Sequence, residues 1–243
     1  MLYRPLFWTS YWCEDWMFSS KYRDANQIII SSASSKTAFC LAYLIKKRIT
    51  KGDISNVTLT GITSKSNLGF TRGLHLYDKV LEYDSFASLK PTSGNGKWIY
   101  ADLAGNENFN DRLFSHLGSN LVAGIALGLT NLSPSAPDAS SIKWSTNTFT
   151  NTPSNAGKKE LEQFFMPEWL NVRRHQFSIE EISALQNRAW KDLMKDCGSW
   201  VKMKHISGGD AVKLAYGKVT KGGFGPDEGM IWSLWDDQPS SKL

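Results

Sequence analysis

Short apolar runs, many of them β-branched, recur along the first half of the chain and predict strands. They cover residues 28–30, 57–62, 79–83, 98–101 and 121–129. The first, Ile28-Ile29-Ile30, is typical of a strand covered on both faces, as in parallel sheets. Segments of helical period lie between the runs, with one apolar face formed by Ala38, Leu41, Ala42 and Ile45 and another by Phe109, Leu113 and Leu117. This alternation predicts a doubly wound, mostly parallel α/β sheet, with any ligand at the carboxyl ends of the strands.

Residues 131–160 interrupt the pattern, because Ser, Thr, Asn and Pro make up more than half of them. They predict a linker or long surface loop. After it, Ser178-Ile179-Glu180-Glu181 is typical of a capped helix start, and a second helix is expected from near Asp210. The sequence therefore predicts an α/β domain over residues 1–130 and a mainly helical segment over residues 161–243 that packs on it.

Composition narrows the function classes. The 243 residues, 41% of them hydrophobic, are enough for one large domain. No apolar stretch reaches the roughly 20 residues that span a bilayer, and the first residues do not begin a secretory signal. We therefore expect a cytoplasmic protein with no membrane partner. Cys13, Cys40 and Cys197 lack metal-ligand spacing, and the net charge of +5 is spread along the chain, so neither a metal nor a nucleic-acid partner is expected.

The turn after the first strand, Ser31-Ser32-Ala33-Ser34-Ser35-Lys36-Thr37, supports three interpretations. Its Lys36-Thr37 ends like a triphosphate-binding loop, but such a loop needs glycines that this turn lacks. A hydroxyl-rich turn that only caps the following helix, through Ser34 or Ser35, is the second. The third is a dinucleotide turn, in which the helix N-terminus holds a pyrophosphate and small hydroxyl residues add donors.

The end of the second strand bears on the choice of nucleotide. Gly61-Ile62-Thr63-Ser64-Lys65-Ser66-Asn67 offers hydroxyls and an ammonium group but no carboxylate. A site for NAD usually has Asp or Glu here, whereas the 2′-phosphate of NADP favours hydroxyls and a cation. The pattern favours NADPH over NADH if a dinucleotide binds. The alternative is that Lys65 is an ordinary surface lysine at a helix start.

Several motifs resemble the successive signatures of one family. They are Tyr3-Arg4-Pro5-Leu6-Phe7, residues 31–38, Gly61-Ile62-Thr63-Ser64 with Asn67, Leu76-Tyr77-Asp78-Lys79-Val80, Tyr83-Asp84, residues 100–106 and residues 162–167. Together they resemble the domain of unknown function 2855 family over nearly the whole chain. That family is similar to medium-chain dehydrogenase/reductases of the quinone-oxidoreductase type. The resemblance implies a Rossmann nucleotide domain that binds NADP, in a family whose own reaction is not established. The leading hypothesis is an oxidoreductase that acts on a small carbonyl or enone substrate in its full two-domain form.

The same resemblance implies roles for individual residues. It places Ser32, Ser34, Ser35, Lys36 and Thr37 at the pyrophosphate, Thr63, Ser64 and Lys65 at the 2′-phosphate, and Ala104 and Gly105 at the nicotinamide-ribose end. Family members normally carry an additional N-terminal GroES-like domain, similar to the chaperonin-10 barrel, which holds the metal ligands of zinc-dependent relatives. The chain begins near the point where that barrel would end, so a truncated form or a fragment is expected.

No residue of the sequence is assigned a catalytic role. Tyr77, Tyr83 and Tyr100 are candidate proton donors, although tyrosine in or beside a strand is most often a packing residue. Trp8, Trp12 and Trp16 recur at four-residue spacing and predict a core stripe or, without a barrel, an exposed stripe that supports a homodimer. The alternative function is therefore that of a non-catalytic Rossmann-fold binding or interaction protein.

Overall fold

The computed structural model describes residues 3–90, 96–127, 161–221 and 224–235 of the chain. The chain divides into two compact units, Tyr3–Asn187 and Arg188–Leu243. The linker predicted over residues 131–160 and the last two residues of the strand predicted over 121–129 lie outside the described residues.

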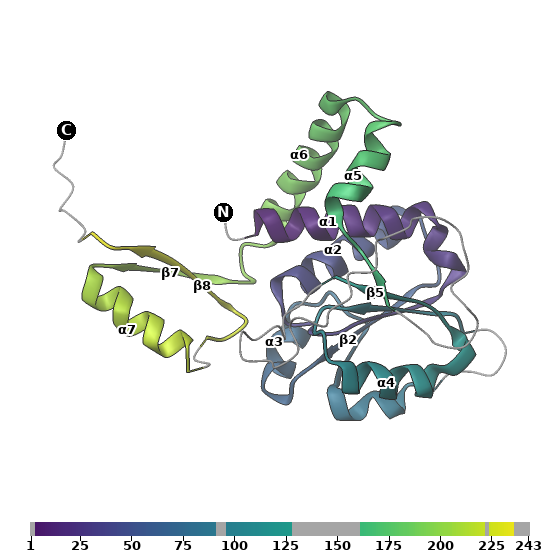
Figure 1. Cartoon of the computed structure of the whole chain (residues 1–243), viewed down its shortest axis with the longest axis horizontal. Helices are drawn as coiled ribbons and strands as arrows, with labels where there is room; N and C mark the ends of the chain where they lie inside the picture. Colours follow the sequence, from purple (N-terminus) through teal and green to yellow (C-terminus); the bar gives the residue numbers. More distant parts are fainter. Residues whose placement is uncertain (1–2, 91–95, 128–160, 222–223, 236–243) are drawn as a thin grey trace. The chain divides into compact units, whose positions relative to one another are not determined.

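The first unit contains a six-stranded parallel sheet in the order β3-β2-β1-β4-β5-β6 (Figure 1). Its strands are β1 (Gln27–Ile30), β2 (Thr58–Thr63), β3 (Lys79–Glu82), β4 (Trp98–Asp102), β5 (Leu121–Ala126) and β6 (Glu162–Gln163). The five strands predicted from the sequence are confirmed. Residues 161–243 were expected to be mainly helical, and β6 is a correction to that expectation because it pairs with β5.

Helices cover both faces of this sheet. They are α1 (Arg4–Ser19), α2 (Lys36–Lys51), α3 (Leu68–Gly73) and α4 (Glu107–Leu117), and Figure 1 shows α1 and α2 on one side of the sheet and α4 on the other. Helix α5 (Met166–Arg174) packs against α1. Ile28, Ile29 and Ile30 are fully buried. Ile29 belongs to the core formed with Phe109 of α4. Because side chains alternate along a strand, its two neighbours face the α2 side, which explains the all-apolar run.

A buried ion pair joins α1 to α2. The Glu14 carboxylate is 2% exposed and lies 2.5 Å from Arg48 Nε, and it also accepts a hydrogen bond from the Tyr22 hydroxyl. Burial raises the pKa of Glu14, although both hydrogen bonds oppose this rise. Because an unpaired buried charge costs several kcal/mol, Arg48 fixes where α1 rests on α2.

Contacts with α5 settle the position of the tryptophan stripe on α1. Arg173 and Trp169 of α5 donate hydrogen bonds to Asp15 at 2.6 and 2.8 Å. Trp12 is only 1% exposed, and Trp16 packs on Phe164 with a ring separation of 5.6 Å. Of the two alternatives for the stripe, core packing holds for Trp12 and the exposed stripe is wrong for it, because its side chain is buried.

The second unit contains β7 (Lys202–Ser207), α7 (Gly209–Val219) and β8 (Glu228–Ser233), and its two strands are parallel. The unit boundary falls inside α6 (Ile179–Asp196). The predicted capped start of α6 is confirmed, because the Glu181 N–H donates to Ser178 Oγ at 3.2 Å and the Ser178 N–H donates to the Glu181 carboxylate at 2.8 Å. The helix expected near Asp210 is α7, whereas neither strand of this unit was predicted.

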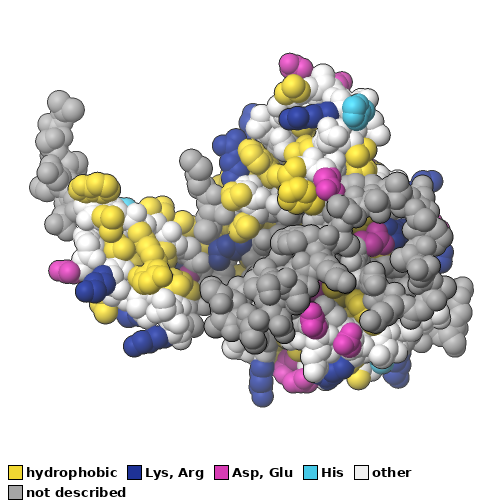
Figure 2. All heavy atoms as spheres, in the orientation of Figure 1, with side chains coloured by type: hydrophobic (Ala, Val, Ile, Leu, Met, Phe, Trp, Pro, Cys, Tyr) yellow, Lys and Arg dark blue, Asp and Glu magenta, His cyan; other side chains and the backbone are white. Residues whose placement is uncertain are grey.

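Hydrophobic side chains gather on the surface of this β7–α7–β8 unit (Figure 2). The large ones that are exposed are Met203, Leu214, Tyr216, Ile231, Trp232, Leu234 and Trp235. Apolar surface of this kind often marks an interaction site.

No helix in the described ranges is long and apolar enough to cross a membrane.

The contact between β2 and the turn after β1 can be tested at Gly61. A Cβ atom there would lie 2.8 Å from Ala33 Cβ and 2.9 Å from Tyr77 Cδ1. We expect Gly61→Ala to lower the free energy of unfolding by about 1–3 kcal/mol, because these neighbours must shift. Gly69→Ala is the matched control: nothing lies within 4 Å of its Cβ position, and alanine should stabilise α3 by up to about 1 kcal/mol. Equal stabilities of the two variants in urea unfolding would contradict this packing.

Candidate functional site

The strand order reverses between β1 and β4, so the chain leaves these neighbouring strands in opposite directions across the sheet. In open parallel sheets this switch point, at the carboxyl ends of the strands, is where ligands bind. Ile30 pairs with Gly61 on one side and with Ala101 on the other. The turns that follow β1, β2 and β4 therefore meet at one edge of the sheet, as the sequence predicted.

The turn after β1 is closed by hydrogen bonds from its own N–H groups. Ser31 donates to the Ala101 carbonyl at 3.0 Å, Ser32 to the Tyr83 hydroxyl at 2.9 Å, Ala33 to the Ile62 carbonyl at 2.9 Å, and Ser35 to the Ser32 carbonyl at 2.7 Å. Ser32 has a φ of 49°, in the left-handed region that favours glycine. The turn thus adopts a glycine-like conformation without glycine.

The first turn of α2 supplies the remaining donors. Ser35 is its N-cap, because its Oγ accepts from the Ala38 N–H at 3.3 Å, which decides between the two capping residues proposed from the sequence. Lys36 and Thr37 begin the helix and are partly buried. Among the described residues, the N–H groups of Ser34 and Thr37 have no acceptor. They lie at the positive end of a 16-residue helix, where an anion is favoured.

Hydrogen bonds join the turn to the end of β2. Ser34 Oγ accepts from Thr63 Oγ1 at 3.1 Å and from Asn67 Nδ2 at 3.0 Å. Thr63 is buried, so its hydroxyl proton already belongs to this contact. Ser64 and Lys65 are exposed beyond it. Of the residues predicted for the 2′-phosphate, the structure therefore leaves Ser64 and Lys65 accessible and buries Thr63.

A buried carboxylate, Asp102, lies at the end of β4 and is 1% exposed. Its Oδ1 accepts from Ser31 Oγ, the Ala104 N–H and the Gly105 N–H, each at 3.0 Å, and its Oδ2 accepts from Asn110 Nδ2 at 2.8 Å. No Lys or Arg in the described part of the chain pairs with it. Neutral donors alone satisfy this charge, and they come from the turn after β1, the turn after β4 and helix α4.

This arrangement bears on the roles predicted for Ala104 and Gly105. Their N–H groups are directed at Asp102 and are not available to a phosphate. Because C=O and N–H point in opposite directions across a trans peptide, the carbonyls of Leu103 and Ala104 point away from Asp102. The N–H groups of this turn therefore serve the carboxylate and not an anion.

The three candidate proton donors occupy different environments. The Tyr77 hydroxyl donates to the Ala33 carbonyl at 2.9 Å, and Tyr100 is fully buried with its hydroxyl 2.7 Å from Asn110 Oδ1. Burial raises the pKa of both phenols, and the Asp102 charge adds to the rise at Tyr100. Burial also raises the pKa of Tyr83, against the effect of the Ser32 N–H. All three hydroxyls stay protonated at neutral pH, and only that of Tyr83 lies on the turn without an acceptor for its proton in the described ranges.

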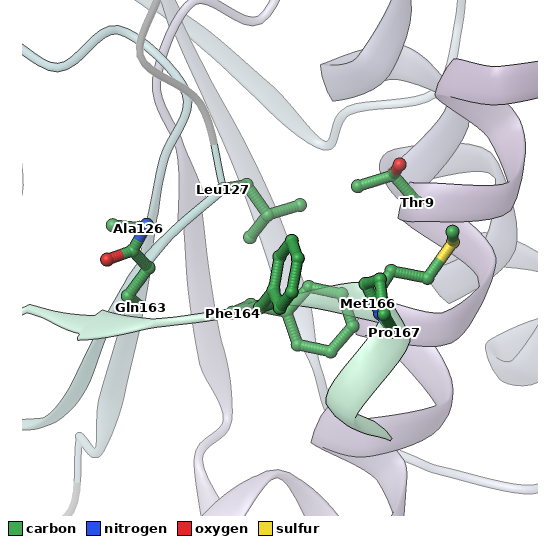
Figure 3. A pocket seen from close by; sticks show the side chains of 8 residues that line it. Thr9, Ala126, Leu127, Gln163, Phe164, Met166 and Pro167 are labelled. Atoms are coloured by element: carbon green, nitrogen blue, oxygen red, sulfur yellow. The ribbon is translucent and has the colours of Figure 1, made fainter. Parts of the chain in front are cut away.

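An apolar hollow of about 380 Å³ opens at the carboxyl ends of β5 and β6. Ala126 and Leu127, residues 163–167 and Thr9 of α1 line it. Figure 3 shows Thr9 facing the side chains of Leu127 and Met166 across this space. Its volume is in the range of small-molecule sites, and its few polar groups are Thr9 and Gln163.

Sequence reasoning missed two features of this edge. It assigned no role to Asp102, although a lone carboxylate at the end of an apolar strand was a visible signal. It also did not place residues 163–167 at the hollow, because β6 was not expected. Among the described residues, no group of three or more His, Cys, Asp or Glu side chains could hold a metal ion.

The sheet order and the polar turns at its switch point define an α/β protein of the Rossmann type. The chain belongs to the family described as protein of unknown function (DUF2855), whose family model matches residues 1–225. A search of the curated proteins found no match to the sequence.

Two solved structures, those of CurA and CurK, share the fold. CurA from Vibrio vulnificus, solved in complex with NADPH, is similar over 96% of this chain and 62% of its own, with 11% identity and a TM-score of 0.51. The CurK enoyl reductase is similar over 92% of this chain and 60% of its own, with 11% identity and a TM-score of 0.50. The yhdH oxidoreductase from Salmonella enterica, solved with NADP, is similar over 93% of this chain and 60% of its own, with 16% identity and a TM-score of 0.47. The chain therefore spans about 60% of the length of these proteins.

The role of Tyr83 in closing the turn can be measured without a ligand. Tyr83→Phe removes the acceptor of the Ser32 N–H, so we expect a loss of about 1 kcal/mol in the free energy of unfolding and faster amide exchange at Ser32. Tyr216→Phe is the control, because Tyr216 is 58% exposed and its hydroxyl has no hydrogen bond within the described ranges. Unchanged exchange at Ser32 would show that the phenol does not hold the turn.

Proposed function

We propose that this chain binds NADPH at the switch point of its sheet and acts as a medium-chain-reductase-like oxidoreductase on a small carbonyl or enone substrate. The observation that carries the proposal is the joining of the serine-rich turn to the Thr63 hydroxyl and the Asn67 amide, which flank the exposed Ser64 and Lys65 in the sequence. The fold shared with CurA, which was solved with NADPH, supports it. Because the chain spans 62% of CurA, the activity is proposed for the protein that carries this Rossmann unit.

Each predicted residue has a role in this proposal. The N-terminus of α2 and the hydroxyls beside it would hold the pyrophosphate, the end of β2 the 2′-phosphate, and the turn after β4 the nicotinamide ribose. The residues are Ser32, Ser34, Ser35, Lys36 and Thr37, then Ser64 and Lys65 with the buried Thr63 bonded to Ser34, then Ala104 and Gly105. The bound cofactor would supply hydride chemistry, and the protein its binding and orientation.

The apolar hollow supports the substrate class. It lies on the same edge of the sheet as the turns, and its walls are formed mainly by Leu127, Phe164, Phe165 and Met166. A small molecule with an apolar body and one carbonyl group matches such a lining, in which Thr9 and Gln163 are the polar side chains.

Cofactor choice is tested at Lys65. We expect Lys65→Ala to weaken NADPH binding by about fivefold to tenfold and to change NADH binding by less than about twofold, because only NADPH carries the 2′-phosphate. Lys51→Ala is the control, since Lys51 is exposed at the C-terminal end of α2, about 24 Å along the helix from the end that faces the proposed site. Calorimetric titration of both cofactors measures this. Failure of wild-type protein to bind either cofactor at millimolar concentration would refute the proposal.

The exposed apolar surface of the β7–α7–β8 unit favours a second candidate function, that of a non-catalytic Rossmann-fold interaction protein. Leu214 is 66% exposed and Trp235 is 78% exposed. Such a protein would keep the fold and bind a partner or a second copy of itself through this surface. It would bind NADPH without turnover, or not at all.

Turnover and assembly together separate the two candidates. An oxidoreductase should consume NADPH in the presence of a panel of small enones and aldehydes, measured by loss of the reduced-nicotinamide absorbance. An interaction protein should show no consumption and should elute above the 27.3 kDa monomer mass. In that case Leu214→Ser should shift it toward the monomer, whereas Lys213→Ser, on the neighbouring polar position of α7, should not. Turnover by a monomer would exclude the second candidate.

A further inference from the structure

Asp102 joins parts of the chain that are distant in sequence. Ser31 and Asp102 are 71 positions apart, yet the Ser31 hydroxyl donates to the carboxylate at 3.0 Å. The same Ser31 oxygen accepts from the Leu103 N–H at 2.9 Å and the Ala104 N–H at 3.2 Å. The turn after β1 and the turn after β4 are therefore bound to each other through one hydroxyl and one carboxylate.

The carboxylate also extends this connection to helix α4. Asn110 donates to Asp102 Oδ2, and its own Oδ1 lies 2.7 Å from the Tyr100 hydroxyl, which is 3.1 Å from Asp102 Oδ1. Asp102, Asn110 and Tyr100 are at most 5% exposed. Hydrogen bonds to a charged acceptor are stronger than neutral ones, and water cannot replace them at buried atoms. Movement of either turn would leave this charge short of donors.

We propose that Asp102 is a positioning residue for the switch point, which fixes both turns in the arrangement that receives a dinucleotide. It does so by drawing the Ser31 hydroxyl and the N–H groups of Ala104 and Gly105 inward. The proposal deepens the assignment of an NADPH site and rests on it for the ligand, but the coupling of the two turns is a property of the protein alone.

The coupling is tested first without a ligand, by amide hydrogen exchange on the full chain. Asp102→Asn keeps the shape of the side chain and removes its charge. We expect exchange to rise by about tenfold or more both at residues 103–105 and in the turn of residues 31–35. Glu14→Gln is the matched control, because Glu14 is the other fully buried carboxylate of the described chain and lies between α1 and α2. It should leave exchange in both turns unchanged.

Ligand binding is tested next, at a temperature where every variant is folded. Asp102→Asn should weaken NADPH binding by about tenfold or more, while Glu14→Gln should not. The double variant Asp102→Asn/Asn110→Asp swaps the two side chains and so keeps one carboxylate and one amide in the contact. Its affinity for NADPH should return to within about threefold of wild type. Ser31→Ala, a smaller change that removes only the link between the turns, should weaken binding in the same direction as Asp102→Asn.

The outcomes distinguish this inference from the proposed function. Faster exchange at residues 103–105 with no change at residues 31–35 would overturn the coupling. Tighter NADPH binding by Asp102→Asn would also overturn it, because the carboxylate would then act only by repelling the phosphates. Coupled exchange in a protein that binds neither NADPH nor NADH would refute the cofactor and leave the role of Asp102 in the turns established.

Discussion

The burial of the Asp102 carboxylate is the constraint on which the ligand edge of the sheet depends. An ionised carboxylate loses several kcal/mol of solvation on burial, and no cation in the described chain compensates it. Neutral donors must surround it instead, and the chain supplies them from the two turns at the switch point and from α4. The requirement holds only if β4 lies beside β1, so this charge ties the order of the strands to the shape of the site.

The turn after β1 shows how the same edge is built without glycine. The left-handed conformation of Ser32 costs about 1–2 kcal/mol for a residue with a Cβ atom. Hydrogen bonds from Ser32 to Tyr83 and from Ala33 to Ile62 offset this cost, because each satisfies an N–H group that the turn would otherwise bury. Gly61 then lets the turn lie directly against β2, where a larger residue would clash. The serine-rich sequence can therefore form a turn of the dinucleotide-binding type. Its hydrogen bonds to Tyr83 and Ile62 and the space left by Gly61 compensate for the absence of glycine in the turn itself.

Local patterns were sufficient to predict most of the fold, because burial on both faces leaves an unmistakable apolar run such as Ile28-Ile29-Ile30 and because helix caps are local. Strand β6 has only two residues, and β7 has only Met203 and Ile206 as apolar residues and is mostly exposed, so neither carries the run that identified the others. At the site, the grouping of the turns followed from topology. The Asp102 network did not, since a contact across 71 positions depends on distances that no local pattern encodes. The individual cofactor contacts remain predictions.

Most N–H groups of the turn after β1 are engaged within the protein, which limits how the turn could bind a pyrophosphate. In a glycine-rich turn, successive N–H groups point at the pyrophosphate. Here four of them, on Ser31, Ser32, Ala33 and Ser35, already serve the protein. A dinucleotide bound at this edge would rely on hydroxyls, on the Ser34 and Thr37 N–H groups and on the dipole of α2, which are fewer and weaker contacts for the pyrophosphate. A larger share of its affinity would then have to come from the 2′-phosphate, next to the exposed Ser64 and Lys65. Such a turn would weaken both cofactors equally, so any preference for NADPH would come from contacts to the 2′-phosphate alone.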